Sequence, residues 1–150
     1  MEKLNRWLTL ASNVGMLIGV FIVVYELRQN TAVSAAQAAF EVNALLDNSY
    51  RVRAQDPRLA KLIEDGHNDP DALDSLEQTQ FSAWLRADMN ATETVWFFYK
   101  NGLIPEEDFA GYRAAICSRV TTAGGRRYWK DEAEYFASGF RESVDRWCFS

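Results

Sequence analysis

The N-terminal part of the chain contains one long apolar run, Trp7–Tyr25. It contains no Asp, Glu, Lys or Arg, and its clearly polar side chains are Thr9, Ser12 and Asn13. A helix over this run is about 28 Å long, close to the roughly 30 Å hydrocarbon core of a bilayer. The pattern predicts a single membrane-spanning helix.

The two ends of this run carry residues that suit a membrane–water interface. Trp7 and Tyr25 close the run, and amphipathic rings prefer the headgroup level. Glu26 and Arg28 follow directly. We predict that these four residues anchor the span at its interfaces.

A cleaved secretory signal is the main alternative for this run, with Val33–Ala35 as its small-residue cleavage site. The run exceeds the roughly 7–15 apolar residues of such signals, and Glu26 and Arg28 separate it from that site. A buried core helix is the other alternative, but an uncharged run of this length is rarely one in so small a protein. The pattern favours a retained anchor.

The helical pattern continues after the span, because no Gly or Pro occurs from Val20 to Asp56. It predicts one helix from about Leu4 to about Ala54, whose outer part, 30–54, forms a stalk. The apolar positions of the stalk recur at helical spacing and form one stripe: Ala35, Ala38, Ala39, Val42, Leu45, Leu46 and Ser49. This stripe must be buried, either by the chain's own later helices or by another copy.

Local start and stop signals predict four further helices. Asp56–Pro57 supplies an N-cap and a proline at the first helical position, and Gly66 is expected to end that helix after Asp65. Asp74 and Glu77 have the spacing of a capping box. The expected helices cover about 57–65, 75–101, 105–122 and 127–147.

Gly124–Gly125 is expected to form a turn between the last two helices. The last helix either continues to about Trp147 without interruption or has a break near Trp129. No strand pattern or internal repeat occurs in the sequence. The sequence therefore predicts an all-α protein with two parts. Residues 1–29 form the transmembrane anchor and its flanks, and residues 30–150 form a small helical-bundle extramembrane domain.

Charge and motifs exclude several classes of function. The net charge is -5, so the chain has no basic surface for nucleic acid, and we expect no nucleic-acid partner. His67 is the single histidine, which excludes metal sites built on histidine pairs. The sequence contains no glycine-rich phosphate loop and no nucleophile motif. We expect no catalytic residue, no metal and no cofactor.

Cys117 and Cys148 are too few to define a disulfide scaffold or a zinc site. They form one bridge if the domain lies in an oxidising compartment, or they are two unrelated thiols. Lys3 and Arg6 precede the span, and Arg28 follows it. The positive-inside bias therefore places the N-terminus in the cytoplasm and the domain in the periplasm, by a small margin.

Small residues line one face of the predicted span. Ala11, Gly15 and Gly19 are four residues apart, and such spacing lets two helix backbones approach closely. Asn13 lies on the roughly opposite face, where a side-chain amide seeks a partner across a helix interface. We predict packing at these four positions. The alternatives are a lipid-facing helix with incidental glycines and an Asn13 that reaches headgroup water.

A polar row lies on the predicted helix 75–101. Arg86, Asn90 and Glu93 share one face, and tryptophans and phenylalanines surround them in the sequence. Buried polar groups require partners. We therefore predict a buried structural network of these three residues, with a catalytic Glu93 as the remote alternative.

Four stretches together resemble a loose group of small bacterial proteins of unknown function. They are YELRQNT at Tyr25, DPRLAKLIEDG at Asp56, NATETVWFFYKNGLI at Asn90 and GGRRYWKDE at Gly124. Proteins of this group share an N-terminal span that ends in a Glu-Leu-Arg-Gln-Asn-like motif, followed by a helical domain. The resemblance implies a single-pass protein of a bacterial inner membrane and brings no activity with it.

The leading functional hypothesis is a non-enzymatic assembly or accessory subunit. Its expected partners are the lipid bilayer, other copies of itself in a homo-oligomer and/or the subunits of a larger membrane complex. The aromatic content of 13% suits a protein interface. The alternatives are a homo-oligomeric pore and a membrane-tethered enzymatic or ligand-binding domain.

Overall fold

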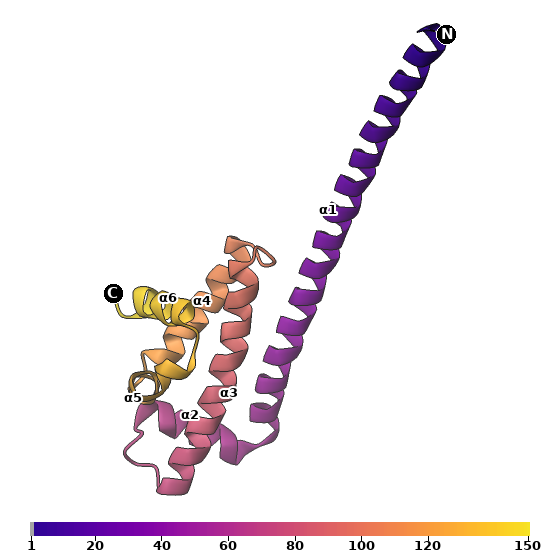
Figure 1. The fold of residues 1–150 in the computed structure, drawn as a ribbon. Helices are drawn as coiled ribbons and strands as arrows, with labels where there is room; N and C mark the ends of the chain where they lie inside the picture. The colour runs from indigo at the N-terminus through magenta and orange to yellow at the C-terminus, as the bar shows by residue number, and fades with distance from the viewer. Residues whose placement is uncertain (1) are drawn as a thin grey trace. The chain divides into compact units, whose positions relative to one another are not determined.

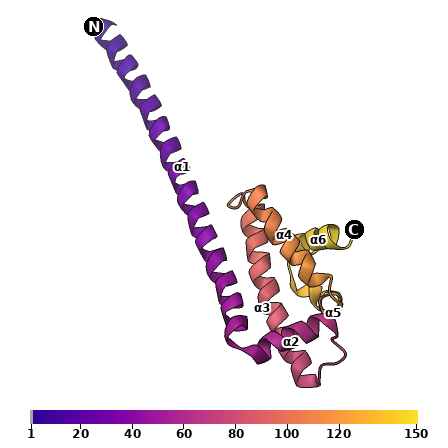
Figure 2. The ribbon, with the colours of Figure 1, turned by 180° about the vertical axis from the view of Figure 1, so that it is seen from behind.

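The computed structural model describes residues 2–150, and every element in that range is helical (Figures 1 and 2). In chain order these are α1 (Glu2–Gln55), α2 (Pro57–Asn68), α3 (Ser75–Lys100), α4 (Glu106–Val120), α5 (Ala123–Glu132), the short 3-10 helix η1 (Ala133–Tyr135) and α6 (Ser138–Cys148). The all-α class and the long N-terminal helix are confirmed.

The chain divides into two compact units, Met1–Gln37 and Ala38–Ser150. Within its described residues, the first unit consists of the N-terminal part of α1. The second contains the rest of α1 and all later helices. The boundary between the units lies after the expected membrane exit near residue 29. From Asn5 onward, Ala38 is the first buried position of α1.

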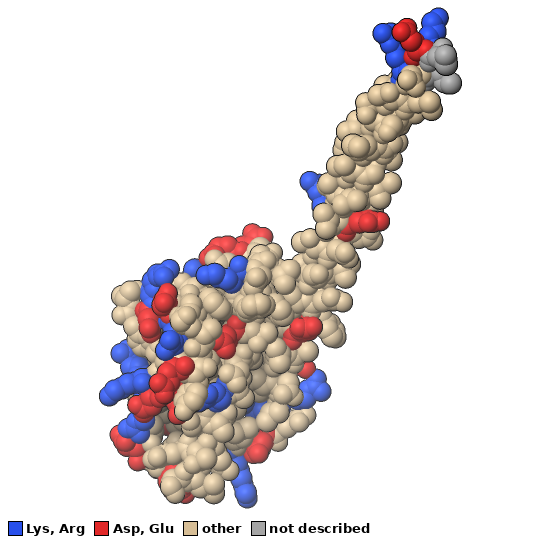
Figure 3. All heavy atoms as spheres, in the orientation of Figure 1, with Lys and Arg blue, Asp and Glu red and all other residues tan. Residues whose placement is uncertain are grey.

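The first unit exposes its whole apolar run. All side chains from Trp7 to Tyr25 are exposed, and within residues 2–150 α1 is the one helix long and apolar enough to cross a membrane. Figure 3 shows this uncharged stretch with charged side chains at both of its ends. The exposed apolar surface requires lipid or protein around it.

The stalk stripe is buried in part, within the second unit, by the chain's own later helices. Ala38 and Val42 are buried in the second unit, and Ser49 is partly buried. The Ser49 hydroxyl lies 3.4 Å from the Asp88 carboxylate, and the Arg53 guanidinium lies 5.6 Å from the centre of the Trp84 ring. These two contacts pair rising numbers in α1 with falling numbers in α3, so the two segments are antiparallel. Two members of the predicted stripe, Ala39 and Leu45, are exposed.

The core of the second unit lies between α3, α4 and α6. Its fully buried side chains come from all three helices: Leu85, Met89 and Val95 from α3, Phe109, Ile116 and Val120 from α4, and Phe140 and Val144 from α6. A second aromatic group joins α5 to this core, where the Trp129 ring lies 5.7 Å from Phe136 and 6.1 Å from Phe140.

Two glycine positions differ from the sequence-based expectation. Gly66 does not end α2, which continues to Asn68, and Gly124–Gly125 lies in the first turn of α5 rather than in an interhelical turn. A Cβ at Gly66 would overlap the Phe81 ring, and a Cβ at Gly124 would overlap the carbonyl oxygen of Gly66. These glycines allow α2 and α5 to cross closely, which explains why they lie inside helices.

The expected helix 127–147 is wrong as one element. Its region contains the end of α5, then η1, then α6, and the break lies at residues 133–137 instead of near Trp129. Trp129 is buried inside α5, and its indole N–H donates to Asp145 at 2.8 Å. Phe136 has an extended backbone and is buried, so the break turns its ring into the core.

Candidate functional site

The four residues predicted for transmembrane packing lie on the exposed helix of the first unit. Ala11, Asn13, Gly15 and Gly19 are all exposed. A Cβ added at Gly15 or Gly19 would meet no atom within 4 Å. The small-residue face is therefore free to receive another helix, and packing there stays a prediction.

The predicted interface anchors are also exposed. Trp7 and Tyr25 are 70% and 69% exposed, and Glu26 and Arg28 follow the apolar run on the same helix. These positions leave both rings free to lie in a headgroup layer.

The predicted network of Arg86, Asn90 and Glu93 is wrong, because no hydrogen bond or ion pair joins these three side chains and two of them bind other partners. Asn90 is exposed, and Arg86 pairs with Glu132 of α5. The Arg86 guanidinium also lies 4.3 Å from the centre of the Tyr135 ring. Arg86 thus holds the end of α5 and η1 against α3.

Glu93 serves a neighbouring segment in a similar way. Its carboxylate accepts a hydrogen bond from the backbone N–H of Ala137 at 2.7 Å. Ala137 is the N-cap position of α6 and has no side-chain oxygen to cap the helix. Glu93 therefore fixes the start of α6, which is a structural role.

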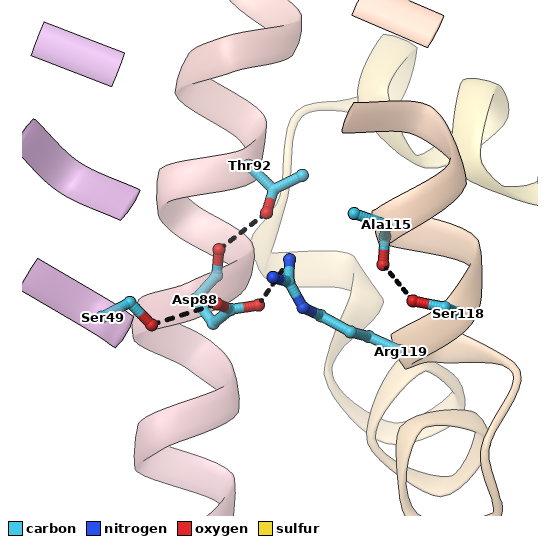
Figure 4. Close-up of polar contacts among 6 residues, drawn as sticks. All are labelled: Ser49, Asp88, Thr92, Ala115, Ser118 and Arg119. Atoms are coloured by element: carbon cyan, nitrogen blue, oxygen red, sulfur yellow. Dashed lines mark hydrogen bonds and ion pairs between the residues drawn. The ribbon is translucent and has the colours of Figure 1, made fainter. Parts of the chain in front are cut away.

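The buried polar cluster of the domain is centred on Asp88 instead (Figure 4). Asp88 lies on α3 and is 4% exposed. One carboxylate oxygen lies 3.1 Å from a guanidinium nitrogen of Arg119 on α4, and the other lies 3.4 Å from the Ser49 hydroxyl of α1. The Thr92 hydroxyl donates to the Asp88 carbonyl oxygen at 2.8 Å. The cluster joins three helices at one point.

Opposing forces act on the Asp88 carboxyl. Burial raises its pKa above the usual range, and the Arg119 guanidinium and the hydrogen bond from Ser49 partly oppose this rise. Sequence analysis missed the pair with Arg119. A signal was present, because Asp88 lies among Leu85, Met89 and Thr92 on the core-facing side of α3.

His67 is a second polar group inside the domain. Its Nδ1 lies 2.9 Å from the Thr122 hydroxyl, and its ring meets Phe81 and Trp84 edge-on at 5.2 and 5.7 Å. Burial, together with the nearby Arg53 and Arg119, lowers the pKa of His67 to about 4. The imidazole is therefore neutral near pH 7 and links α2 to the start of α5.

Cys117 and Cys148 form a disulfide bond with a Cα–Cα distance of 5.0 Å. It joins α4 to the end of α6. The sequence left open whether the two cysteines are bonded or are unrelated thiols, and in the structure they are bonded. Both cysteines of the chain are used in this bond.

Within residues 2–150, no group of three or more His, Cys, Asp or Glu side chains is arranged to hold a metal ion. Comparisons with protein-family models, with characterised proteins and with solved structures find no match to this chain.

Proposed function

We propose that this protein is a single-pass, non-enzymatic membrane subunit that assembles with other copies or with a larger membrane complex through its N-terminal helix. The observation that supports this most directly is the exposed run Trp7–Tyr25, with Gly15 and Gly19 uncovered on one face. An apolar helix of this length is stable in a bilayer, and small residues allow a second helix to pack closely.

The structural roles of the polar groups in the domain support a scaffold. Arg86 and Glu93 each bind a neighbouring segment, and Asp88 and Arg119 neutralise each other. Such groups stabilise one conformation of the bundle. A rigid domain suits a subunit that acts through its surfaces.

We place the domain on the periplasmic side of a bacterial inner membrane, with the N-terminus in the cytoplasm. The Cys117–Cys148 bond supports this orientation, because disulfides persist in oxidising compartments. Lys3 and Arg6 before the span favour the same orientation. The resemblance to small bacterial single-pass proteins supports the choice of membrane.

The assembly proposal is tested on the full-length protein in mild detergent. Mass measurement should give a particle larger than one copy, or stoichiometric co-purification with other membrane subunits. Gly15→Ile and Gly19→Ile should abolish this association while the near-UV circular dichroism of the domain stays unchanged. Leu17→Ile, on a different face of the helix, is the matched control. A monomer without partners, in detergent and in nanodiscs, would refute the proposal.

The orientation is tested separately with alkaline phosphatase fused after Ser150, since this reporter is active only where disulfides form. We expect the fusion to be active. In intact cells, Cys117 and Cys148 should react with an alkylating reagent only after the disulfide has been reduced. An inactive fusion together with two free thiols would reject the periplasmic placement.

A further inference from the structure

A cavity of about 170 Å³ opens on the second unit between α3, α5 and the α2–α3 connection. Pro70, Leu73 and Phe81 form its apolar side, and Leu73 and Phe81 are buried. For comparison, an engineered apolar cavity of about 150 Å³ holds one benzene molecule. The cavity therefore has room for a six-membered ring or a branched aliphatic group.

Charge is unevenly distributed at the mouth of this cavity. Arg127 lines it, but its guanidinium is already paired with the Asp71 carboxylate at 2.5 Å. Asp131 lines it one helical turn later and forms none of the ion pairs found within residues 2–150. Arg127 also attracts Asp131, but its single positive charge faces the two carboxylates of Asp71 and Asp131. The mouth therefore carries one negative charge in excess, and it favours a positively charged ligand.

The opposite wall supplies neutral acceptors. Gln78 and Ser82 lie one turn apart on α3, and both line the cavity. The Gln78 amide nitrogen donates to the Leu73 carbonyl oxygen at 3.0 Å, which leaves the amide oxygen free to accept. A primary ammonium carries three N–H donors, and the lining offers acceptors on both helices, Asp131 on α5 and Gln78 and Ser82 on α3.

We propose that this cavity binds a small primary amine that carries a compact apolar group, with the group against Phe81 and the ammonium at Asp131. A ligand that is only an anion would face Asp131 and Asp71. A zwitterion should bind more weakly than a cation, because Arg127 would have to give up its ion pair with Asp71 to bind the ligand's carboxylate. This site goes beyond the assembly role and does not depend on it.

The test measures binding of 2-phenylethylamine to the full-length protein in nanodiscs by isothermal titration, with empty nanodiscs subtracted. Three further probes separate the contributions: 2-phenylethanol lacks the charge, ethylamine lacks the ring, and L-phenylalanine adds a carboxylate. We expect saturable binding of 2-phenylethylamine. The other three probes should each bind at least about tenfold more weakly, a difference of about 1.4 kcal/mol.

Variants locate the site. Asp131→Asn should weaken binding of 2-phenylethylamine at least fivefold, and Ser82→Phe, which fills the cavity, should abolish it. Glu134→Gln removes an exposed carboxylate outside the cavity and should have no effect. Near-UV circular dichroism checks that each variant is folded, and Asp131 is exposed, so its substitution leaves the core intact.

Several results would overturn the proposal. These are the absence of saturable binding by 2-phenylethylamine, or equal binding by wild type and Asp131→Asn. If 2-phenylethanol bound as tightly as 2-phenylethylamine, the ligand would not need a positive charge and the cationic class would be refuted. If L-phenylalanine bound more tightly than 2-phenylethylamine, the ligand class would be a zwitterion and not a simple cation.

Discussion

Arg119→Met tests the buried ion pair that joins α3 to α4. The substitution removes the guanidinium and keeps an apolar stem in its place. Asp88 then remains with a side chain that is 3% exposed and with one weak contact, the Ser49 hydroxyl at 3.4 Å. Removing one partner of a buried pair costs about 3–5 kcal/mol, a large share of the roughly 5–15 kcal/mol that stabilises a typical domain. We expect a loss of this size in the free energy of unfolding.

The assay is urea unfolding of the full-length protein in detergent micelles, followed by near-UV circular dichroism of the tryptophans in the domain. Arg113→Met is the matched control, because Arg113 also lies on α4. Its ion pair with Glu106 is 3.2 Å long, with side chains that are 40% and 59% exposed. Exposed pairs contribute about 0–1 kcal/mol, so the control should lose little.

The pH dependence of Arg119→Met gives an independent check. Without the guanidinium, the pKa of Asp88 rises further, so the folded state binds a proton more readily than the unfolded state does. The stability deficit is then greatest near pH 7 and shrinks as the pH falls through the folded pKa of Asp88. Equal losses in both arginine variants, or a deficit that does not change with pH, would refute the reasoning.

Three further predictions concern other parts of the domain. Gly124→Ala should lower the free energy of unfolding by about 1–3 kcal/mol, because its Cβ would overlap the α2 backbone. Gly111 lies inside α4, where a Cβ meets open space, so Gly111→Ala should raise the free energy of unfolding by about 0.5–1 kcal/mol in the same urea titration. His67 has a folded pKa of about 4 against 6.5 for the free side chain, so wild type should lose on the order of 2–3 kcal/mol as the pH falls from 6.5 to 4, and His67→Gln should lack this component; identical pH profiles would contradict it. Reduction of the Cys117–Cys148 bond, which spans 31 residues, should lower the free energy of unfolding by about 3–4 kcal/mol. Thiol counting verifies the reduction, and an unchanged urea midpoint would contradict the prediction.

Local signals in the sequence predicted most helix starts correctly. The Asp74 side chain accepts from the Glu77 backbone N–H at 2.8 Å, and the Glu77 carboxylate accepts from the Asp74 backbone N–H at 3.0 Å. Asp56 caps α2 in the same local manner. These signals succeed because all atoms of a cap lie within a few residues of one another.

Gly66 and Gly124 show where local reasoning ends. Glycine suits both a helix end and a close helix crossing. The choice between these roles depends on a contact between α2 and α5, which are far apart in the sequence. The pattern therefore predicted a boundary where the fold has a crossing.

The polar residues show the same limit. Helical spacing predicted that Arg86 and Glu93 share a face of α3 and bind each other, but each side chain binds a different segment outside that helix. Asp88 lies on the core-facing side, and its partner Arg119 is supplied by another helix. Spacing identifies the face of a helix, whereas the partner of each side chain depends on tertiary packing.

The disulfide has a consequence for the synthesis of this protein. Cys148 is the last residue of α6 and follows the other helices of the bundle in chain order, so its bond to Cys117 can close only after α6 has been synthesised. A chain that stops before Cys148 carries an unpaired thiol at Cys117. Complete and incomplete domains thus differ chemically. A thiol-reactive quality-control factor can react with Cys117 of an incomplete domain, whereas a complete domain offers it no free thiol.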